Sequence, residues 1–324
     1  MVKWFLFAIN LIVGISSYSQ ADSAQSELKY SFIYDKPNYA WFSAGLTYDI
    51  GLNPYNTTLF ALGADANIKH EKFNFNFHSR MHFAEGYTDK SLNGKPTTES
   101  VYLPERSRDI GFDFSFYFKN DAKKMDQKMM LRHRRQPKLE KLIPAYKSFR
   151  WGADIGFSGG VSYYNFGNSI LTGVDEDGNQ AEIESSKNDA SVSTYFTQKI
   201  IRLGASRVST LNFKIKAEKY GTKNWREFSR IYFHGLIGVG QTLDDVLVPF
   251  ENVQNLQLFD RYELNSNAKM NPIGFAAGYE YFNMKKIGLG YIAEVGIQPG
   301  PRYAFGNNFF LNLKLRLHLG TTLG

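Results

Sequence analysis

Strict alternation of leucine with polar residues near the end of the chain places the strongest constraint on how it can fold. The stretch FFLNLKLRLHLG, residues 309–320, holds five leucines in one row and, in the other, Asn312, Lys314, Arg316 and His318. Successive side chains of a β-strand point to opposite faces, so one face of this strand is pure leucine and the other is basic. Two structures accept such a strand: a soluble sheet that buries the leucines, or a membrane barrel that turns them toward lipid.

Alternating segments of this kind recur along the chain and are separated by stretches rich in turn residues. Each spans about ten residues, the length of a strand in a transmembrane β-barrel, and together they predict about twelve strands. The even total that a single-chain bacterial barrel requires depends on the segment 256–264, which has the weakest alternation. The predicted strands cover residues 42–50, 60–68, 72–84, 110–118, 149–163, 190–201, 208–220, 226–240, 256–264, 273–282, 287–297 and 309–320.

The apolar rows are rich in Phe, Tyr and Leu. The chain has 27 Phe and 20 Tyr, and aromatic residues make up 16% of it. A soluble core of that area would need a second layer to cover it, and no helical layer is predicted. A two-sheet sandwich is the alternative, but the export signal at the N-terminus favours a barrel, which also leaves no unpaired edge in hydrocarbon. The predicted fold class is all-β, a single closed antiparallel transmembrane β-barrel of about 12 strands.

The first residues have the pattern of a secretory signal peptide. Lys3 supplies a positive charge, residues 4–15 are apolar, and the small residues that follow fit cleavage near 19–21. No later apolar run is long enough for a transmembrane helix, which excludes a helical membrane protein. The predicted organisation is a signal peptide at 1–21, a periplasmic segment at 22–38, and a barrel at 39–320 with a basic insertion at 119–147.

The basic insertion, residues 119–147, interrupts the alternation. It carries ten Lys or Arg against three acidic residues, and its net charge of +7 equals that of the whole chain. Nucleic-acid binding by an exported barrel is not expected. Ala122, Met125 and Met129 would share one face of a short helix before Pro137, which would let the segment lie on an anionic membrane surface or dock a periplasmic partner. The alternative is a solvated turn with scattered charge.

Polar side chains of the inward rows are predicted to line the lumen. Their charges nearly cancel, which argues against strong selectivity for anions or cations. In the last hairpin Glu294 and Lys314 lie diagonally opposite each other, so an ion pair is expected between them. The predicted lumen-lining residues are Asp49, Asp65, His78, Arg80, His82, Asp113, Arg150, Asp154, Lys214, Lys216, Glu218, Arg230, Glu280, Glu294, Lys314, Arg316 and His318.

One stretch matches a catalytic motif. In GFSGG, residues 156–160, Ser158 occupies the nucleophile position of G-x-S-x-G, but alternation continues through it where the motif needs a strand, a turn and a helix. A lipid hydrolase with Ser158 as nucleophile and His78 or His82 as base is kept as an alternative, and no catalytic residue is assigned. The two histidines are four residues apart on one strand with Arg80 between them, so no metal ion is expected there, and no cofactor is expected elsewhere.

The signal peptide, the alternating strands rich in Phe and Tyr, and the last strand FFLNLKLRLHLG together resemble those of uncharacterised porin-like outer-membrane β-barrels of the Bacteroidota type. The resemblance implies a protein of the Gram-negative outer membrane that contacts outer-membrane lipids and the barrel-insertion machinery. It also implies a porin-like channel for small hydrophilic solutes. The alternatives are a plugged barrel that acts as a binding or assembly scaffold for secretion or surface anchoring, and an outer-membrane lipid hydrolase.

Overall fold

The described chain consists of strands and short turns. A computed structural model describes residues 28–37, 40–52, 58–86, 108–133, 136–165, 170–174, 180–184, 193–243, 246–249, 259–264, 270–301 and 308–323. Within these ranges no helix is long and apolar enough to cross a membrane. The predicted all-β class is confirmed. The predicted signal peptide, residues 1–21, lies outside the described residues.

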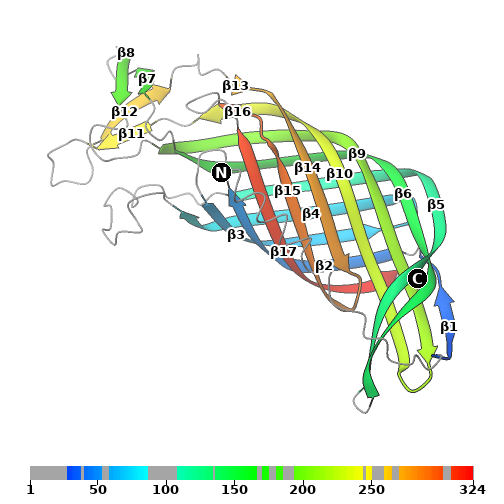
Figure 1. Ribbon diagram of the computed structural model, residues 1–324. Helices are drawn as coiled ribbons and strands as arrows, with labels where there is room; N and C mark the ends of the chain where they lie inside the picture. The colour runs from blue at the N-terminus through cyan, green and yellow to red at the C-terminus, as the bar shows by residue number, and fades with distance from the viewer. Residues whose placement is uncertain are drawn as a thin grey trace, which may run out of the picture.

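Ten strands pair in a ring and close an antiparallel barrel (Figure 1). The ring follows the chain from β2 around to β17, which pairs back onto β2, so the ring is closed. Closure of this kind satisfies the backbone donors and acceptors within the ring internally. The barrel strands are β2 (Ala40–Leu52), β3 (Thr58–Lys69), β4 (Phe73–Gly86), β5 (Arg108–His133), β6 (Gln136–Asn165), β9 (Ser193–Ala217), β10 (Gly221–Leu243), β14 (Ile273–Asn283), β15 (Ile287–Ile297) and β17 (Phe309–Leu323).

Seven short strands lie outside the ring. β1 (Tyr30–Asp35) pairs with β9 alone. Four strands of the long connections form a small sheet, and two more form a two-residue pair (Figure 1). These six are β7 (Ile170–Val174), β8 (Gln180–Glu184), β11 (Val246–Pro249), β12 (Phe259–Leu264), β13 (Met270–Asn271) and β16 (Gly300–Pro301).

The prediction of about twelve barrel strands is wrong by two. The predicted strands 190–201 and 208–220 are parts of the single strand β9, and the segment 256–264 contributes β12, which pairs with β7 and β11 instead of the barrel. The sequence Gly204-Ala205-Ser206 resembles a turn, but Gly204 has another role. A Cβ atom at Gly204 would collide with the backbone oxygen of Phe233 and stand 2.7 Å from Cδ2 of His234, so the glycine makes room for β10 and for that ring.

The two ends of the barrel differ in their connections. At one end, here the turn end, residues 70–72, 218–220 and 284–286 are tight connections, and β2 begins beside the end of β17 where Ala40 pairs with Leu323. At the other end, the loop end, connections such as 87–107 are much longer. Short turns on one side and long loops on the other are the pattern of outer-membrane barrels.

Apolar and polar rows separate cleanly on the two faces of the barrel wall. On β17 the five leucines between 311 and 319 point outward and are 38% to 65% exposed, whereas Lys314, Arg316 and His318 point inward and are buried. The other barrel strands follow the same rule, with outward Leu46, Phe112 and Phe233 exposed. The leucine row of the last strand is therefore part of a continuous outer apolar surface.

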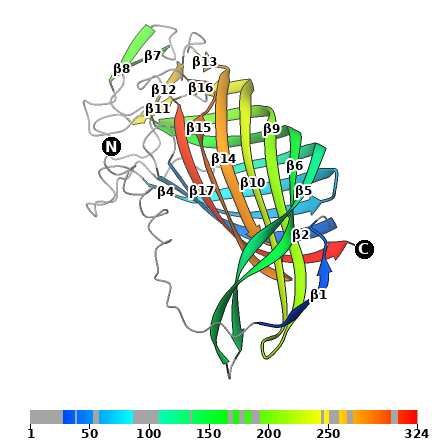
Figure 2. The same cartoon turned by 45° about the vertical axis from the view of Figure 1, so that its right-hand side comes forward.

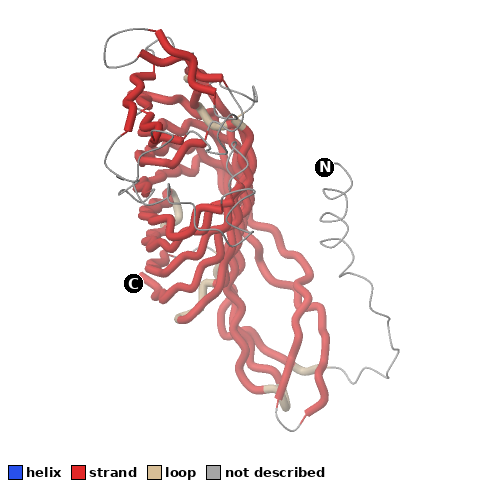
Figure 3. Tube along the Cα trace, turned by 90° about the vertical axis from the view of Figure 1, so that its left-hand side faces the viewer, coloured by secondary structure: helices blue, strands red, loops and turns tan. Residues whose placement is uncertain are grey.

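At the turn end two hairpins run on beyond the barrel and form a projection, here the basal lobe (Figures 2 and 3). It comprises residues 119–147 of the β5–β6 hairpin, residues 212–226 of the β9–β10 hairpin, and residues 28–37 with β1. The short helix expected before Pro137 is wrong, and so is the solvated turn, because this segment continues the strands β5 and β6.

Apolar packing holds the two hairpins of the basal lobe together. A bulge between Tyr117 and Lys119 shifts the register of β5 by one residue, so the odd-numbered residues beyond it join the outward row. That row packs against the outward row of β9, which removes both from water. The fully buried members of this core are Met129, Leu131, Ile143, Ala145, Phe213 and Ile215.

β1 takes the place of β6 at the edge of β9. β6 pairs with β9 down to the pair of Lys147 with Leu211, and β1 pairs with residues 213–217 beyond it. At this fork Tyr146 is still paired with Lys124 of β5 but no longer with β9, and its backbone N–H donates to both carboxylate oxygens of Asp35 at 3.1 and 3.0 Å. Asp35 thus joins the first strand to both hairpins.

The outward row of β17 generates a prediction for folding into lipid. Leu313→Arg should cost about 2 to 4 kcal/mol of folding free energy, because it places a charge on the lipid side near mid-strand. Folding of the refolded chain into phospholipid vesicles, titrated with urea, measures this cost. Thr321→Arg is the matched control, since Thr321 lies on the same strand at the turn end and should cost less than about 1 kcal/mol. Equal costs for the two variants would contradict a lipid-facing leucine row.

The fork of the basal lobe generates a second prediction. Asp35→Ala should speed hydrogen exchange of the Tyr146 amide about fivefold, since it removes a hydrogen bond worth about 1 kcal/mol. Burial raises the pKa of Asp35, while the N–H of Tyr146 and the charge of Lys124 lower it less. The Asp35 contribution to stability is therefore largest at low pH and falls as pH rises through the raised pKa. Asp35→Asn keeps an acceptor and should retain protection without this pH dependence; an unchanged Tyr146 amide in the Ala variant would disprove the link.

Candidate functional site

The lumen holds a set of ionisable side chains that are mostly buried. Among the described barrel residues seven carboxylates face seven Lys or Arg side chains, so the charges balance. Most of these groups are buried, and ions in such a place are stable only when they are paired and hydrogen-bonded. They are Asp49, Asp65, Asp109, Asp113, Asp154, Glu280 and Glu294 against Lys69, Arg80, Arg150, Arg202, Arg230, Lys314 and Arg316.

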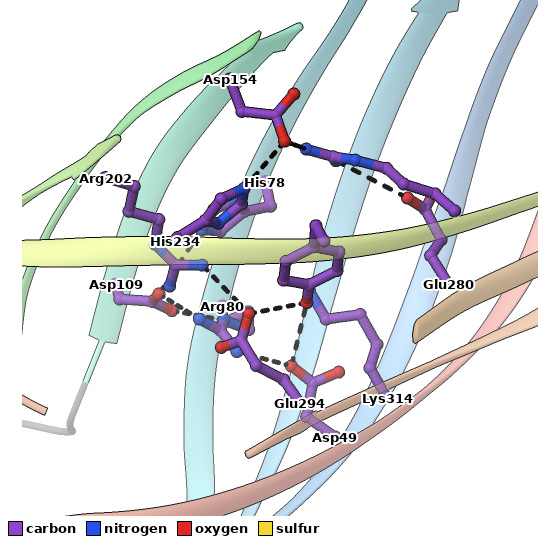
Figure 4. Close-up of polar contacts among 12 residues, drawn as sticks. Asp49, His78, Arg80, Asp109, Asp154, Arg202, His234, Glu280, Glu294 and Lys314 are labelled. Carbon is purple, nitrogen blue, oxygen red and sulfur yellow. Dashed lines mark hydrogen bonds and ion pairs between the residues drawn. The ribbon is translucent and has the colours of Figure 1, made fainter. Parts of the chain in front are cut away.

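Asp154 on β6 is the centre of one group of contacts (Figure 4). Its Oδ2 accepts from Arg230 at 2.8 Å and lies 3.0 Å from Nε2 of His234, both on β10, and its Oδ1 accepts from the hydroxyl of Ser206 at 2.9 Å. Arg230 reaches on to Glu280 at 3.8 Å. The carboxylate thus links β6, β9, β10 and β14 through the interior of the barrel.

Arg80 on β4 is the centre of a second group (Figure 4). It forms a two-point contact with Asp109, at 2.7 Å from Nε and 2.6 Å from Nη2, and donates to Asp49 at 3.1 Å. Two parallel hydrogen bonds fix the guanidinium plane, so this pair is directional as well as charged. Lys314 lies 3.8 Å from the same Asp49, and His78 lies 3.6 Å from Asp109.

The predicted ion pair between Glu294 and Lys314 is wrong. Glu294 instead binds Arg202 at 3.2 Å and the Tyr232 hydroxyl at 2.7 Å, and Lys314 turns to Asp49 (Figure 4). The register pairs Glu294 with Asn312, so Lys314 is diagonal to it as expected. Glu294 thus pairs with a non-neighbouring strand, because the barrel is narrow enough for such side chains to meet. Lys314 pairs with the residue directly opposite it on the neighbouring strand β2.

Toward the turn end the lumen is filled by aromatic rings and a buried lysine. The Nζ atom of Lys69 lies 2.9 Å from the ring centroid of Phe228 and 4.2 Å from that of Phe282, and these two rings stack at 4.7 Å. Trp41 packs into the same cluster and is 1% exposed. A water-filled passage here would leave these inward side chains accessible, and Lys69 itself is only 3% exposed.

Toward the loop end a cavity of about 150 Å³ opens above the Arg80 group. Charged groups on its wall are Arg80 and Arg202 with Asp49, Asp109 and Glu294, and Ile200, Leu236 and Phe310 supply an apolar side. Two buried acceptors on this wall, Oδ1 of Asp49 and Oε1 of Gln198, have no hydrogen-bond partner among the described residues. The cavity is therefore polar and suited to water or a small hydrophilic molecule.

Most of the predicted lumen residues lie inside the barrel. The exceptions are Lys214, Lys216 and Glu218, for which the prediction is wrong, because β9 has already left the barrel and entered the basal lobe after Leu211. The side chain of His82 lies outside the described residues. Inside the barrel are Asp49, Asp65, His78, Arg80, Asp113, Arg150, Asp154, Arg230, Glu280, Glu294, Lys314, Arg316 and His318.

Four central members of the network were missed by the sequence: Asp109, Arg202, Tyr232 and His234. Arg202 falls in the gap between the predicted strands 190–201 and 208–220, so the sequence does not place it on a strand. If β9 is read as one strand, the alternation places Arg202 in the same inward row as Gln198 and Ser206. No comparable pattern signals which inward residues contact each other.

Ser158 lies on the inward row of β6, on the wall of the cavity. It and His78 are both opposite Gly111, on either side of β5. Among the described side chains no hydrogen bond joins Ser158 to a histidine, and His78 contacts Asp109. Groups of His, Asp and Glu that would hold a metal ion are likewise absent from the described ranges.

The Asp154 group generates a prediction for stability. Asp154→Ala should lower the unfolding free energy by about 3 to 5 kcal/mol, because it leaves Arg230 and His234 buried without their closest acceptor. Urea unfolding of the refolded protein measures the loss. Glu140→Ala is the control: it breaks the 2.6 Å pair with Lys128, in which both side chains are at least half exposed, and should cost less than about 1 kcal/mol. Similar losses in both variants would contradict a stabilising role for the buried group.

No protein-family model matches the chain, and no curated protein matches it by sequence. Among solved structures it is similar to the translocator domain of autotransporter NalP from Neisseria meningitidis, with 10% identity over 87% of this chain and 88% of that chain and a TM-score of 0.25. A deletion mutant of the monoaromatic hydrocarbon channel TodX matches with 8% identity over 89% and 91% of the two chains and a TM-score of 0.26. OmpT, an outer membrane protein of Vibrio cholerae, matches with 7% identity over 90% and 99% and a TM-score of 0.17. TM-scores this low say nothing about what this chain does.

Proposed function

We propose that the chain is an integral outer-membrane β-barrel with a sealed lumen, which serves as a binding and assembly scaffold and displays the basal lobe in the periplasm. The observation that carries the proposal is the filled lumen. A barrel whose interior is closed by its own side chains acts through its surfaces, and the basal lobe projects beyond the barrel wall (Figure 3).

The outward surface supports a membrane location. Large apolar side chains are exposed on every barrel strand, in a band that no other part of the described chain covers. An exposed apolar surface of this extent is unfavourable in water but is the ordinary lipid-facing surface of a barrel. Members of the band are Leu46, Leu62, Phe75, Phe112, Ile155, Leu203, Phe233, Phe275, Leu289 and Leu317.

The connections support a periplasmic position for the basal lobe. In outer-membrane barrels the short turns and both chain ends are periplasmic, and the long loops are extracellular. Here β2 starts and β17 ends at the turn end, where the lobe also begins. The loop end would then face the cell exterior.

The filled lumen supports a scaffold over a channel. From the Arg316–Asp65 pair at 2.8 Å to the ring cluster around Lys69, inward side chains of the turn-end half have almost no accessible surface. An open porin is wide enough to keep an aqueous passage, whereas barrels of about eight to ten strands are filled by their own side chains. The balanced ion pairs serve here to brace the wall.

A porin-like channel for small hydrophilic solutes is the second candidate, and the polar cavity at the loop end favours it. In that case the ring cluster around Lys69 would have to move for a solute to pass. A lipid hydrolase using Ser158 gains no comparable support, because Ser158 points into the lumen and away from lipid.

Ion conductance separates the two candidates. The refolded full chain in planar lipid bilayers should give no conductance steps, because the ring cluster leaves no path for hydrated ions. A general porin inserted in the same bilayer is the open control. Steady, reproducible steps from the wild-type chain would overturn the scaffold proposal in favour of the channel.

The same preparations test the scaffold directly. Deletion of residues 121–140 removes most of the β5–β6 hairpin beyond the barrel and should reduce the set of proteins that crosslink to the chain from the periplasm. Heat-modified mobility on gels checks that the barrel still folds. An identical set of crosslinked partners for the deletion variant and the wild type would contradict the proposal.

A further inference from the structure

The basal lobe concentrates the positive charge of the molecule. Its three segments, 28–37, 119–147 and 212–226, carry 17 Lys or Arg against five acidic residues, a net charge of +12. The whole chain has a net charge of +7, so the remainder is net negative. This asymmetry gives the turn end a field that attracts anions.

At the junction of barrel and lobe two cations lie on the outward face beside aromatic rings. The guanidinium of Arg207 on β9 lies 4.9 Å from the ring centroid of Phe149 and 5.5 Å from that of Trp151, both on β6. Nζ of Lys147 lies 5.9 Å from the ring centroid of Phe149. In the described part of the chain neither Arg207 nor Lys147 is paired with a carboxylate.

The register places this cluster at the border of the apolar band. Arg207 is directly opposite Trp151, and Ile155 is directly opposite Leu203 toward the loop end on the same two strands. Ile155 and Leu203 are exposed and outward-facing. The two pairs are four residues apart, about 13 Å along a strand. An acyl chain that lay along Ile155 and Leu203 would have its phosphate level with Arg207.

The β5–β6 hairpin lies on the lipid side of β9. The outward row of β9 that meets lipid in the barrel continues as Leu211, Phe213 and Ile215, and the hairpin covers it. The hairpin therefore extends outward from the wall and does not lie beneath the lumen. Figures 1 and 2 show it crossing the end of β9. Its surface combines exposed lysines such as Lys119 and Lys123 with exposed Phe118 and Tyr146.

We infer that this junction, formed by Arg207, Lys147, Phe149 and Trp151, is a binding site for the phosphate of anionic phospholipids in the leaflet next to the basal lobe. The cations supply the charge, the rings hold Arg207 flat against the wall, and the hairpin beyond them adds further lysines below the head groups. The inference deepens the proposed function, on which it rests for the position of the barrel in a membrane, and it gives the lobe a lipid ligand.

Lipid selectivity measured by electron paramagnetic resonance tests the site. The full chain is reconstituted in phosphatidylcholine bilayers with a trace of spin-labelled phosphatidylglycerol or spin-labelled phosphatidylcholine, and the motionally restricted fraction is compared. We expect about fivefold stronger association of phosphatidylglycerol, the factor that one basic side chain contributes at an anionic surface. The preference should fall toward unity in the Arg207→Gln, Lys147→Gln double variant.

Lys199→Gln is the matched control. Lys199 is exposed and outward-facing on the same strand as Arg207 but lies near the loop end, opposite Gly159. The preference for phosphatidylglycerol should be unchanged in this variant. Equal losses of preference in Lys199→Gln and in the double variant would overturn the site. The absence of a preference in the wild type would also overturn it. If the wild type instead associates with peptidoglycan sacculi or an acidic protein and shows no lipid preference, the lobe has another ligand and the inference is wrong.

Failure of this inference differs from failure of the proposed function. A chain that conducts ions but keeps its phosphatidylglycerol preference loses the scaffold and retains the lipid site. A sealed chain without the preference retains the scaffold and loses the lipid site.

Discussion

A ring of ten strands leaves an interior so narrow that side chains of non-neighbouring strands touch, and the other features of the barrel depend on this. Arg80 of β4 reaches Asp49 of β2, Arg202 of β9 reaches Glu294 of β15, and Arg316 of β17 reaches Asp65 of β3. Each contact skips at least one strand of the ring. Because inward charges are removed from bulk water, each must find its partner, and the pairing holds distant strands at fixed spacing.

The alternation of the sequence predicted the strand class, the two faces and most of the inward residues, since these follow from the period of a strand. It did not predict the strand count, because Gly204 looks like part of a turn when the partner ring of His234 is unknown. Nor did it predict the pairing of Glu294 with Arg202, since contacts across the lumen depend on which strands face each other after closure. Sequence patterns report local geometry, and these contacts are not local.

The basal lobe shows the same limit in another form. Its methionines at 125 and 129 fit a helical spacing, and its many lysines resemble a solvated turn. One bulged residue next to Tyr117 changes which face of β5 points outward, and the new row then finds the continued outward row of β9. A single irregularity, invisible in composition, thus converts two strand extensions into a packed unit with its own core.

The position of β1 has a consequence for the order of assembly. β1 comes first in the described chain, yet it pairs with the part of β9 just beyond the last β6 contact, and its Asp35 closes on Tyr146 of β6. β1, β6 and β9 come together only after β6 and β9, from the middle of the chain, have paired with each other. Among the described strands, β1 therefore precedes its partners β6 and β9 in the chain and cannot reach its final contacts until both of them are in place.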